Sequence, residues 1–175
     1  MKGKKALILV TAIFILPVVA AKLVLEFDWY SRGVTNKGEL LAEAVNTDWL
    51  EENGQWRLVY TLPSDCDALC ETALFQLTQI PVAVGREQER VSSIVLVSDR
   101  PSDNKNIEVR QQSMDAQQQK TMAALPYGND AIYIVDPLNN LILAYPIPEG
   151  KDAQITQSKG LLSDLRKLMK MSKVG

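Results

Sequence analysis

Two cysteines carry the most specific chemistry that this sequence offers. Cys66 and Cys70 are the only cysteines among its 175 residues, they are four positions apart, and the chain has no histidine. A Cys-x-x-x-Cys pair can close a disulfide, provide a reactive thiolate or bind a soft metal ion. The missing histidine excludes a Ser-His-Asp triad, a Cys-His nucleophile pair, and zinc or copper sites with a histidine ligand.

The neighbouring sequence predicts that this pair lies between a strand and a helix. Residues 55–61 are apolar and aromatic, which is typical of a short strand, and Pro63 and Ser64 end it. Residues 67–84 then place leucine, isoleucine and alanine at helical spacing along one face. Ser64 or Asp65 is the expected helix cap.

A helix start is a favourable place for a thiolate, because its first N–H groups are unpaired and the helix dipole is positive there. We therefore expect Cys66 to be the more exposed and more acidic thiol. Cys70, one turn further along, would be the resolving thiol. The alternative is that the two cysteines form an inert structural disulfide, although a bridge over so short a loop removes little chain entropy.

The elements that follow predict one α/β domain. The expected segments are a strand at 91–97, a helix at 113–125, a hairpin of strands 131–135 and 141–145, and a last helix from about 159 to 171. This order of strand, helix, strand, helix, hairpin and helix is that of a thioredoxin-like domain, and cysteines between the first strand and helix fit it.

The N-terminus predicts a membrane anchor. Lys2, Lys4 and Lys5 precede an apolar segment, 6–25, that only Lys22 interrupts. About 20 helical residues span the roughly 30 Å of a bilayer core, and positive charge on the short flank places that flank in the cytoplasm.

A cleaved signal peptide is the alternative, because Val19-Ala20-Ala21 resembles a cleavage site. We favour an uncleaved anchor, since the apolar sequence continues through Leu25. Trp29 and Tyr30 would then lie at the membrane interface.

These features divide the chain into four parts. The expected parts are a cytoplasmic N-terminus (1–5), a transmembrane anchor (6–25), a tether (26–52) and a thioredoxin-like domain (53–175). Residues 39–45 of the tether are expected to form a short helix or an extended lead-in. A net charge of −2 gives no electrostatic surface for nucleic acid, so we expect none to bind.

Several segments of this chain resemble the Sco-type thioredoxin-like proteins that assist cytochrome c oxidase assembly. The similarity lies in the N-terminal anchor, in Cys66-Asp67-Ala68-Leu69-Cys70 after an apolar strand, and in the late Ala131-Ile132-Tyr133-Ile134-Val135-Asp136-Pro137. Residues 35–41 (Thr-Asn-Lys-Gly-Glu-Leu-Leu) and 160–170 look more narrowly like small membrane proteins of proteobacterial cytochrome oxidase biogenesis.

The resemblance implies a single-pass protein of the inner membrane with a periplasmic domain. Its implied partner is cytochrome c oxidase subunit II or another oxidase assembly factor. It would either deliver copper to the paired cysteines of the copper centre or keep those thiols reduced.

Copper binding is the point at which this chain departs from the Sco pattern. Sco-type copper sites add a histidine shortly before the late strand, and the corresponding residues here, 126–130, are Pro-Tyr-Gly-Asn-Asp. Cu(I) could still be held by Cys66 and Cys70, alone or with Met114 or Met122. We favour thiol–disulfide exchange by Cys66 and Cys70, with Cu(I) delivery as the alternative.

Two other function classes remain open from the sequence. The chain could be a tethered assembly scaffold whose disulfide is only structural. A thioredoxin-like peroxidase is disfavoured, because Pro63 and Ser64 do not provide the Thr-x-x-Cys pattern that such enzymes resemble.

Overall fold

The computed structural model describes residues 2–26, 35–51, 54–98 and 107–172. The chain divides into two compact units, one up to Thr35 and one from Asn36 onward. Trp29 and Tyr30, the expected interface residues, lie outside the described part.

The first unit is the helix α1 (Lys2–Glu26), which contains Pro17. Within α1, the 22 residues Gly3–Val24 have a mean hydropathy of 2.6. Among the described residues, this is the one helix that is long and apolar enough to cross a membrane. Its length of about 33 Å matches a bilayer core.

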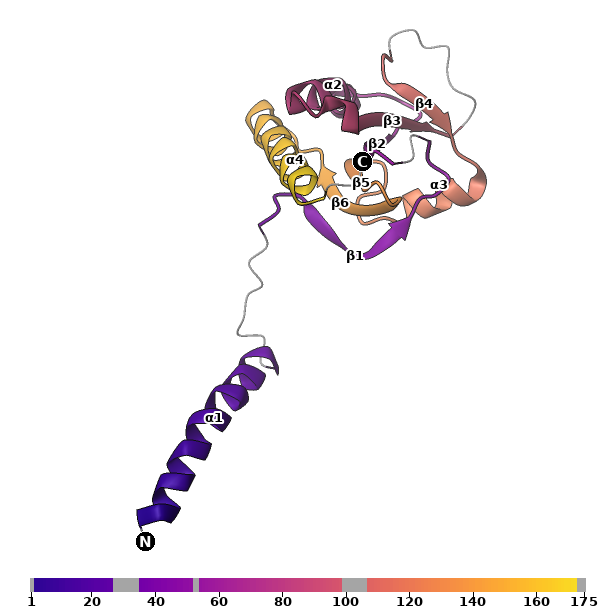
Figure 1. Ribbon diagram of the computed structural model, residues 1–175. Coiled ribbons are helices and arrows are strands. Elements are labelled where there is room, and N and C mark those ends of the chain that lie inside the picture. Colours follow the sequence, from indigo (N-terminus) through magenta and orange to yellow (C-terminus); the bar gives the residue numbers. More distant parts are fainter. Residues whose placement is uncertain (1, 27–34, 52–53, 99–106, 173–175) are drawn as a thin grey trace. The chain divides into compact units, whose positions relative to one another are not determined.

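The second unit is built on one sheet of six strands (Figure 1). The strands are β1 (Glu39–Asn46), β2 (Trp56–Thr61), β3 (Val91–Val97), β4 (Arg110–Ser113), β5 (Ala131–Val135) and β6 (Asn140–Pro146). Their order is β1-β6-β5-β2-β3-β4. β2, β3 and β4 are parallel, whereas β5 runs antiparallel to β2 and to β6, and β6 antiparallel to β1.

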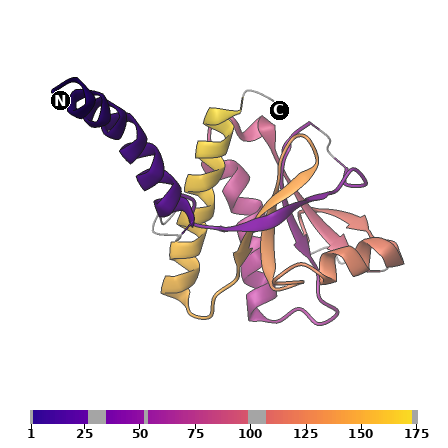
Figure 2. The ribbon, with the colours of Figure 1, turned by 90° about the horizontal axis from the view of Figure 1, so that it is seen from below.

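Helices cover both faces of this sheet (Figure 2). The helices are α2 (Ala68–Val84), the short 3₁₀ turn η1 (Gln88–Arg90), α3 (Ala116–Ala123) and α4 (Lys151–Met171). α2 and α4 pack on one face, where Leu58, Tyr60, Leu77 and Leu165 belong to one buried cluster. α3 packs on the other, where Val59 and Met122 belong to a second cluster. The alternation along β2 reflects the two-residue period of a strand.

A contact between α2 and β3 compensates for a proline inside α2. Pro81 has no N–H, so the carbonyl of Leu77, four residues earlier, lacks its usual helical donor. The hydroxyl of Ser93 in β3 donates to that carbonyl oxygen at 2.7 Å. The proline is therefore accommodated, and the bond joins the helix to the sheet.

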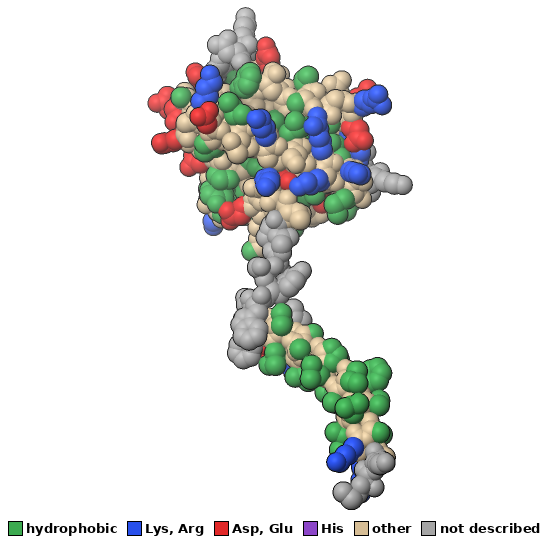
Figure 3. Space-filling view, turned by 90° about the vertical axis from the view of Figure 1, so that its left-hand side faces the viewer, with side chains coloured by type: hydrophobic (Ala, Val, Ile, Leu, Met, Phe, Trp, Pro, Cys, Tyr) green, Lys and Arg blue, Asp and Glu red, His purple; other side chains and the backbone are tan. Residues whose placement is uncertain are grey.

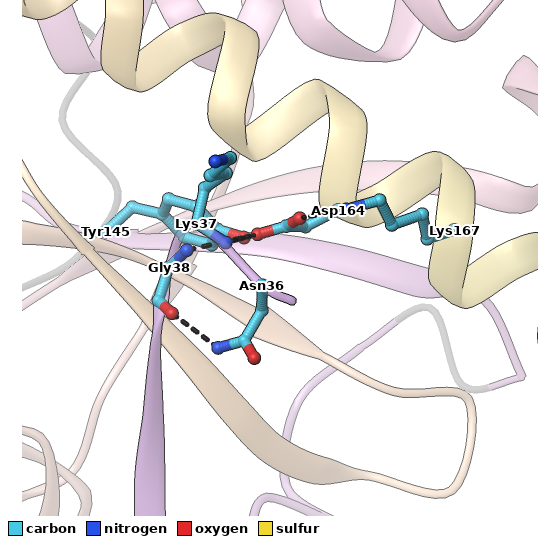
Figure 4. Close-up of polar contacts among 6 residues, drawn as sticks. All are labelled: Asn36, Lys37, Gly38, Tyr145, Asp164 and Lys167. Carbon is cyan, nitrogen blue, oxygen red and sulfur yellow. Dashed lines mark hydrogen bonds and ion pairs between the residues drawn. The ribbon is translucent and has the colours of Figure 1, made fainter. Parts of the chain in front are cut away.

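The chain enters the second unit through a clasp that joins the start of β1 to α4 (Figure 4). The carboxylate of Asp164, which is buried, accepts hydrogen bonds from the backbone N–H groups of Lys37 and Gly38 and from the Tyr145 hydroxyl. Lys167 Nζ lies 3.5 Å from the other carboxylate oxygen. A Cβ at Gly38 would overlap the Tyr145 ring, so this position requires glycine.

The structure confirms the mixed α/β architecture, the hairpin and the helix after the cysteines. It corrects three details. Residues 39–46, which the sequence placed in the tether 26–52, form β1 and belong to the sheet. α4 begins at Lys151 and not near 159. The cap of α2 is Asp67 and not Ser64 or Asp65.

Candidate functional site

The two cysteines lie at the start of α2 and are joined by a disulfide. Their Cα atoms are 5.2 Å apart. Asp67 fixes this local structure, because its side chain accepts hydrogen bonds from the N–H groups of Leu69 and Cys70, each at 3.0 Å. Cys66 thus precedes the helix, and Cys70 lies in its first turn.

The two cysteines differ in their exposure to solvent. Cys66 is exposed, whereas Cys70 is only 1% exposed and belongs to the cluster between the sheet and α2. The expected difference in exposure is confirmed. A thiol or disulfide from another molecule can therefore approach Cys66 and not Cys70.

A cavity of about 420 Å³ opens beside Cys66. Its apolar lining comes from the end of β2, from α2 and from the segment before β4, and comprises Leu62, Leu74, Phe75, Ile107 and Val109. Thr78, Glu71 and Glu108 complete it. The exposed cysteine thus faces an apolar hollow whose lining, within the part of the chain that the structure describes, has acidic and no basic side chains.

A smaller cavity of about 110 Å³ lies on the Cys70 side. Tyr60, Asp67 and Asp130 line it together with Cys70. Burial raises the pKa of Tyr60 to about 12, with further contributions from the negative charges of Asp67 and Asp130. Tyr60 therefore remains a neutral phenol at physiological pH.

One residue of the stretch 126–130, in which a Sco-type protein would have its histidine, lies near Cys70. Asp130, the last residue of that stretch, lines the same cavity as Cys70. A carboxylate is a hard ligand that does not suit Cu(I). Among the described residues, no three His, Cys, Asp or Glu side chains form a group that could hold a metal ion. The donor set therefore does not fit a Sco-type copper site.

The methionines considered as a third copper ligand are not brought to the cysteines. Met114 and Met122 are buried in the cluster on the α3 face of the sheet, whereas Cys70 is buried on the α2 face. The sheet lies between them, so we discard both as ligands.

Sequence reasoning missed the surroundings of the pair. Phe75 was assigned no role, yet it is 65% exposed and lines the cavity beside Cys66. Its position five residues after Cys70, off the apolar face of the helix, was the available signal. Tyr60 and Asp130 could not be associated with Cys70 without the pairing of β2 with β5.

Several solved structures are similar to this chain. The ScoI proteins of Bradyrhizobium japonicum and Arabidopsis thaliana, both solved with copper bound, are 16% and 14% identical over 61% and 66% of this chain. The similarity covers 85% and 86% of those proteins, with TM-scores of 0.42 and 0.47. A SCO1/SenC family lipoprotein from Bacillus anthracis is 10% identical over 79% of this chain and 98% of its own, with a TM-score of 0.48.

Sco-type proteins are thus among the structures to which the chain is similar, as its sequence suggested. No curated protein matches it. A family model does: residues 56–172, from the first residue of β2 to the residue after α4, match the transmembrane-like, thioredoxin-like C-terminal domain. This range is more than half of the chain and includes both cysteines. The chain therefore belongs to the family defined by that thioredoxin-like C-terminal domain.

Proposed function

We propose that this chain is a membrane-anchored, extracytoplasmic thiol–disulfide exchange protein that acts through Cys66 and Cys70. The observation that carries the proposal is the pairing of an exposed sulfur with a buried one at a capped helix start. This arrangement allows one sulfur to meet the partner and the other to resolve the intermediate. An inert structural disulfide does not need an exposed sulfur beside an open cavity.

The exchange proceeds in two balanced steps. The Cys66 thiolate attacks one sulfur of a partner disulfide, a mixed disulfide forms, and the other partner sulfur leaves as a thiolate. The Cys70 thiolate then attacks Cys66, the Cys66–Cys70 disulfide forms, and the partner leaves as a dithiol. Two electrons pass from the pair to the partner, and a dithiol donor in the same compartment returns the pair to its reduced form.

We further propose that the partner is the paired cysteines of the copper centre in cytochrome c oxidase subunit II, or another oxidase assembly factor. Those cysteines must be reduced before they bind metal, and the chain resembles Sco-type proteins. The proposed place of action is the inner membrane, with the second unit in the periplasm. The apolar α1 and the lysines at its start support this placement.

Copper delivery is the second candidate, because two thiolates alone can bind Cu(I). Exchange is favoured, since Met114 and Met122 lie across the sheet and Asp130 is a poor ligand for Cu(I).

Reduced full-length protein and its C66S and C70S variants test the proposal against both alternatives. With a peptide disulfide as substrate, the wild type should lose two thiols per chain, C66S should not react, and C70S should stop at a mixed disulfide. Anaerobic Cu(I) competition on the same samples should show no tightly held ion. One ion held by the wild type and lost in both variants would instead favour copper delivery. Intact oxidase assembly with C66S would favour a scaffold.

A further inference from the structure

The cavity beside Cys66 has features that select a partner. We infer that it is a docking groove for a partner segment in which a cysteine is accompanied by an apolar side chain and by lysine or arginine. This inference rests on the exchange function proposed above and names the kind of segment that Cys66 meets.

The apolar part of the groove is open to solvent. Phe75 is 65% exposed although it lies on a helix whose other large apolar residues mostly face the sheet. Leu62, Leu74 and Ile107 beside it are only partly buried. Burying an aromatic ring and its apolar neighbours under a partner side chain would contribute favourably to docking.

The shared cavity limits the expected spacing in the partner. Cys66, which meets the partner's cysteine, and Phe75 line the same cavity of about 420 Å³. An extended chain advances about 3.3 Å per residue, so it crosses such a cavity in a few residues. The partner's apolar side chain should therefore lie within a few positions of its cysteine.

The described charged side chains at the groove are acidic. Glu71 and Glu108 line it, and Asp65 and Asp67 flank Cys66; all four are exposed. No described hydrogen bond or ion pair uses the carboxylate of Glu71 or Glu108. A lysine or arginine in the partner would find complementary charge here, and an acidic segment would be repelled.

This acidity is local and is not a property of the whole surface. Figure 3 looks onto the side of the folded unit that carries α4, where lysine and arginine side chains are grouped. The basic residues of α4, all exposed, are Lys151, Lys159, Arg166, Lys167 and Lys170. Lys151, at the start of α4, lines a separate cavity that Glu71 and Phe75 also border, so one basic side chain approaches the groove there. The other basic residues of α4 lie further along that helix and would repel a basic partner segment.

The test uses the reduced full-length C70S protein, whose only thiol is Cys66. Three blocked peptides carry one cysteine activated as a disulfide with nitrothiobenzoate. The leucine–lysine peptide has a leucine two residues from the cysteine and also two lysines. The glutamate peptide has two glutamates in place of the lysines. The third peptide has glycine in place of the leucine. Attack by Cys66 forms the protein–peptide disulfide and releases coloured nitrothiobenzoate, so the rate is read directly.

The leucine–lysine peptide should react about tenfold faster than either other peptide at low salt, and its advantage over the glutamate peptide should shrink as salt is added. Replacing Glu71 and Glu108 by glutamine should remove most of that charge preference. F75A should slow the leucine–lysine peptide about fivefold. E149Q, which removes an exposed carboxylate that does not line the groove, should change nothing.

The mixed disulfide of cysteamine and nitrothiobenzoate, which is small and has no net charge, tests the exchange function separately from docking. It should react equally with all groove variants, which also shows that they are folded. If it reacts but the three peptides differ by less than twofold, the docking inference is wrong and the exchange function stands. If Cys66 fails to react even with the small disulfide, the exchange function itself is wrong.

Discussion

At the scale of single residues, the two cysteines have opposite surroundings although only three residues separate them. Cys70 is held in the first turn of α2, where Asp67 binds its N–H and the sheet covers its sulfur. Cys66 stands before the helix, outside that cluster. The disulfide thus has one sulfur open to attack, which sets the direction in which an exchange reaction can begin.

This difference predicts unequal alkylation of the reduced thiols. In C70S, Cys66 should react with iodoacetamide at least tenfold faster than Cys70 does in C66S, because Cys70 must first become exposed. Single-turnover alkylation, followed by mass spectrometry, measures both rates. Addition of a moderate concentration of urea is the control, since it should raise the Cys70 rate much more than the Cys66 rate. Equal rates in native buffer would remove the basis for assigning Cys66 as the attacking thiol.

At the scale of secondary-structure elements, β3 repairs the hydrogen bonding of α2. The carbonyl of Leu77 has lost its donor at Pro81 and receives the Ser93 hydroxyl instead. S93A should therefore lower the free energy of unfolding by about 1–2 kcal/mol, because a half-buried carbonyl loses its partner.

A double-mutant cycle tests this mechanism by urea unfolding. In a P81A background the alanine N–H can donate to Leu77, so the loss caused by S93A should fall to well under 1 kcal/mol. If S93A costs the same in both backgrounds, the serine acts through packing and not through this bond.

The clasp at Asp164 should stabilise the fold mainly through its buried hydrogen bonds. D164A leaves the N–H groups of Lys37 and Gly38 and the Tyr145 hydroxyl without their acceptor, and should cost about 2–4 kcal/mol. K167Q should cost less than 1 kcal/mol, because Lys167 is half exposed and its ion pair is screened. Urea unfolding of both variants measures the difference. Similar losses would mean that the ion pair within α4, and not the buried hydrogen bonds to the start of β1, accounts for the cost of D164A.

Part of the fold could not be predicted from the sequence, because its signals are weak or depend on contacts between distant residues. The apolar pattern of the last helix begins at Leu161, so the polar turns from Lys151 onward gave no signal. β1 is stabilised by pairing with β6 and by the buried Asp164, which are contacts between distant residues. β4 is a polar edge strand of four residues. The cysteines, the first strand and the helix after them were predictable because their signals are local.

At the scale of the whole molecule, the chain joins an apolar helix to a folded unit through only nine residues, 27–35. Fully extended, such a segment spans roughly 30 Å. If α1 is an anchor, the Cys66 site cannot leave the neighbourhood of the membrane. Membrane proteins and proteins docked at the membrane would then meet this site most readily, which fits work on one partner better than general disulfide reduction.

The Cys66 site stays at the membrane only if α1 is not cleaved off. The mass of the mature protein in bacterial cells tests whether α1 remains attached. We expect the full chain to stay in the membrane pellet after alkaline extraction with residues 1–21 still present, because the apolar stretch continues to Val24. A21L should leave the size unchanged, since it blocks only a signal-peptidase site. An impermeant maleimide should label reduced Cys66 in cells with a permeabilised outer membrane, because we expect the lysines at the start of α1 to keep the N-terminus in the cytoplasm. A soluble product shortened at Ala21, restored to full length by A21L, would show that α1 is a signal peptide and would release the exchange site from the membrane.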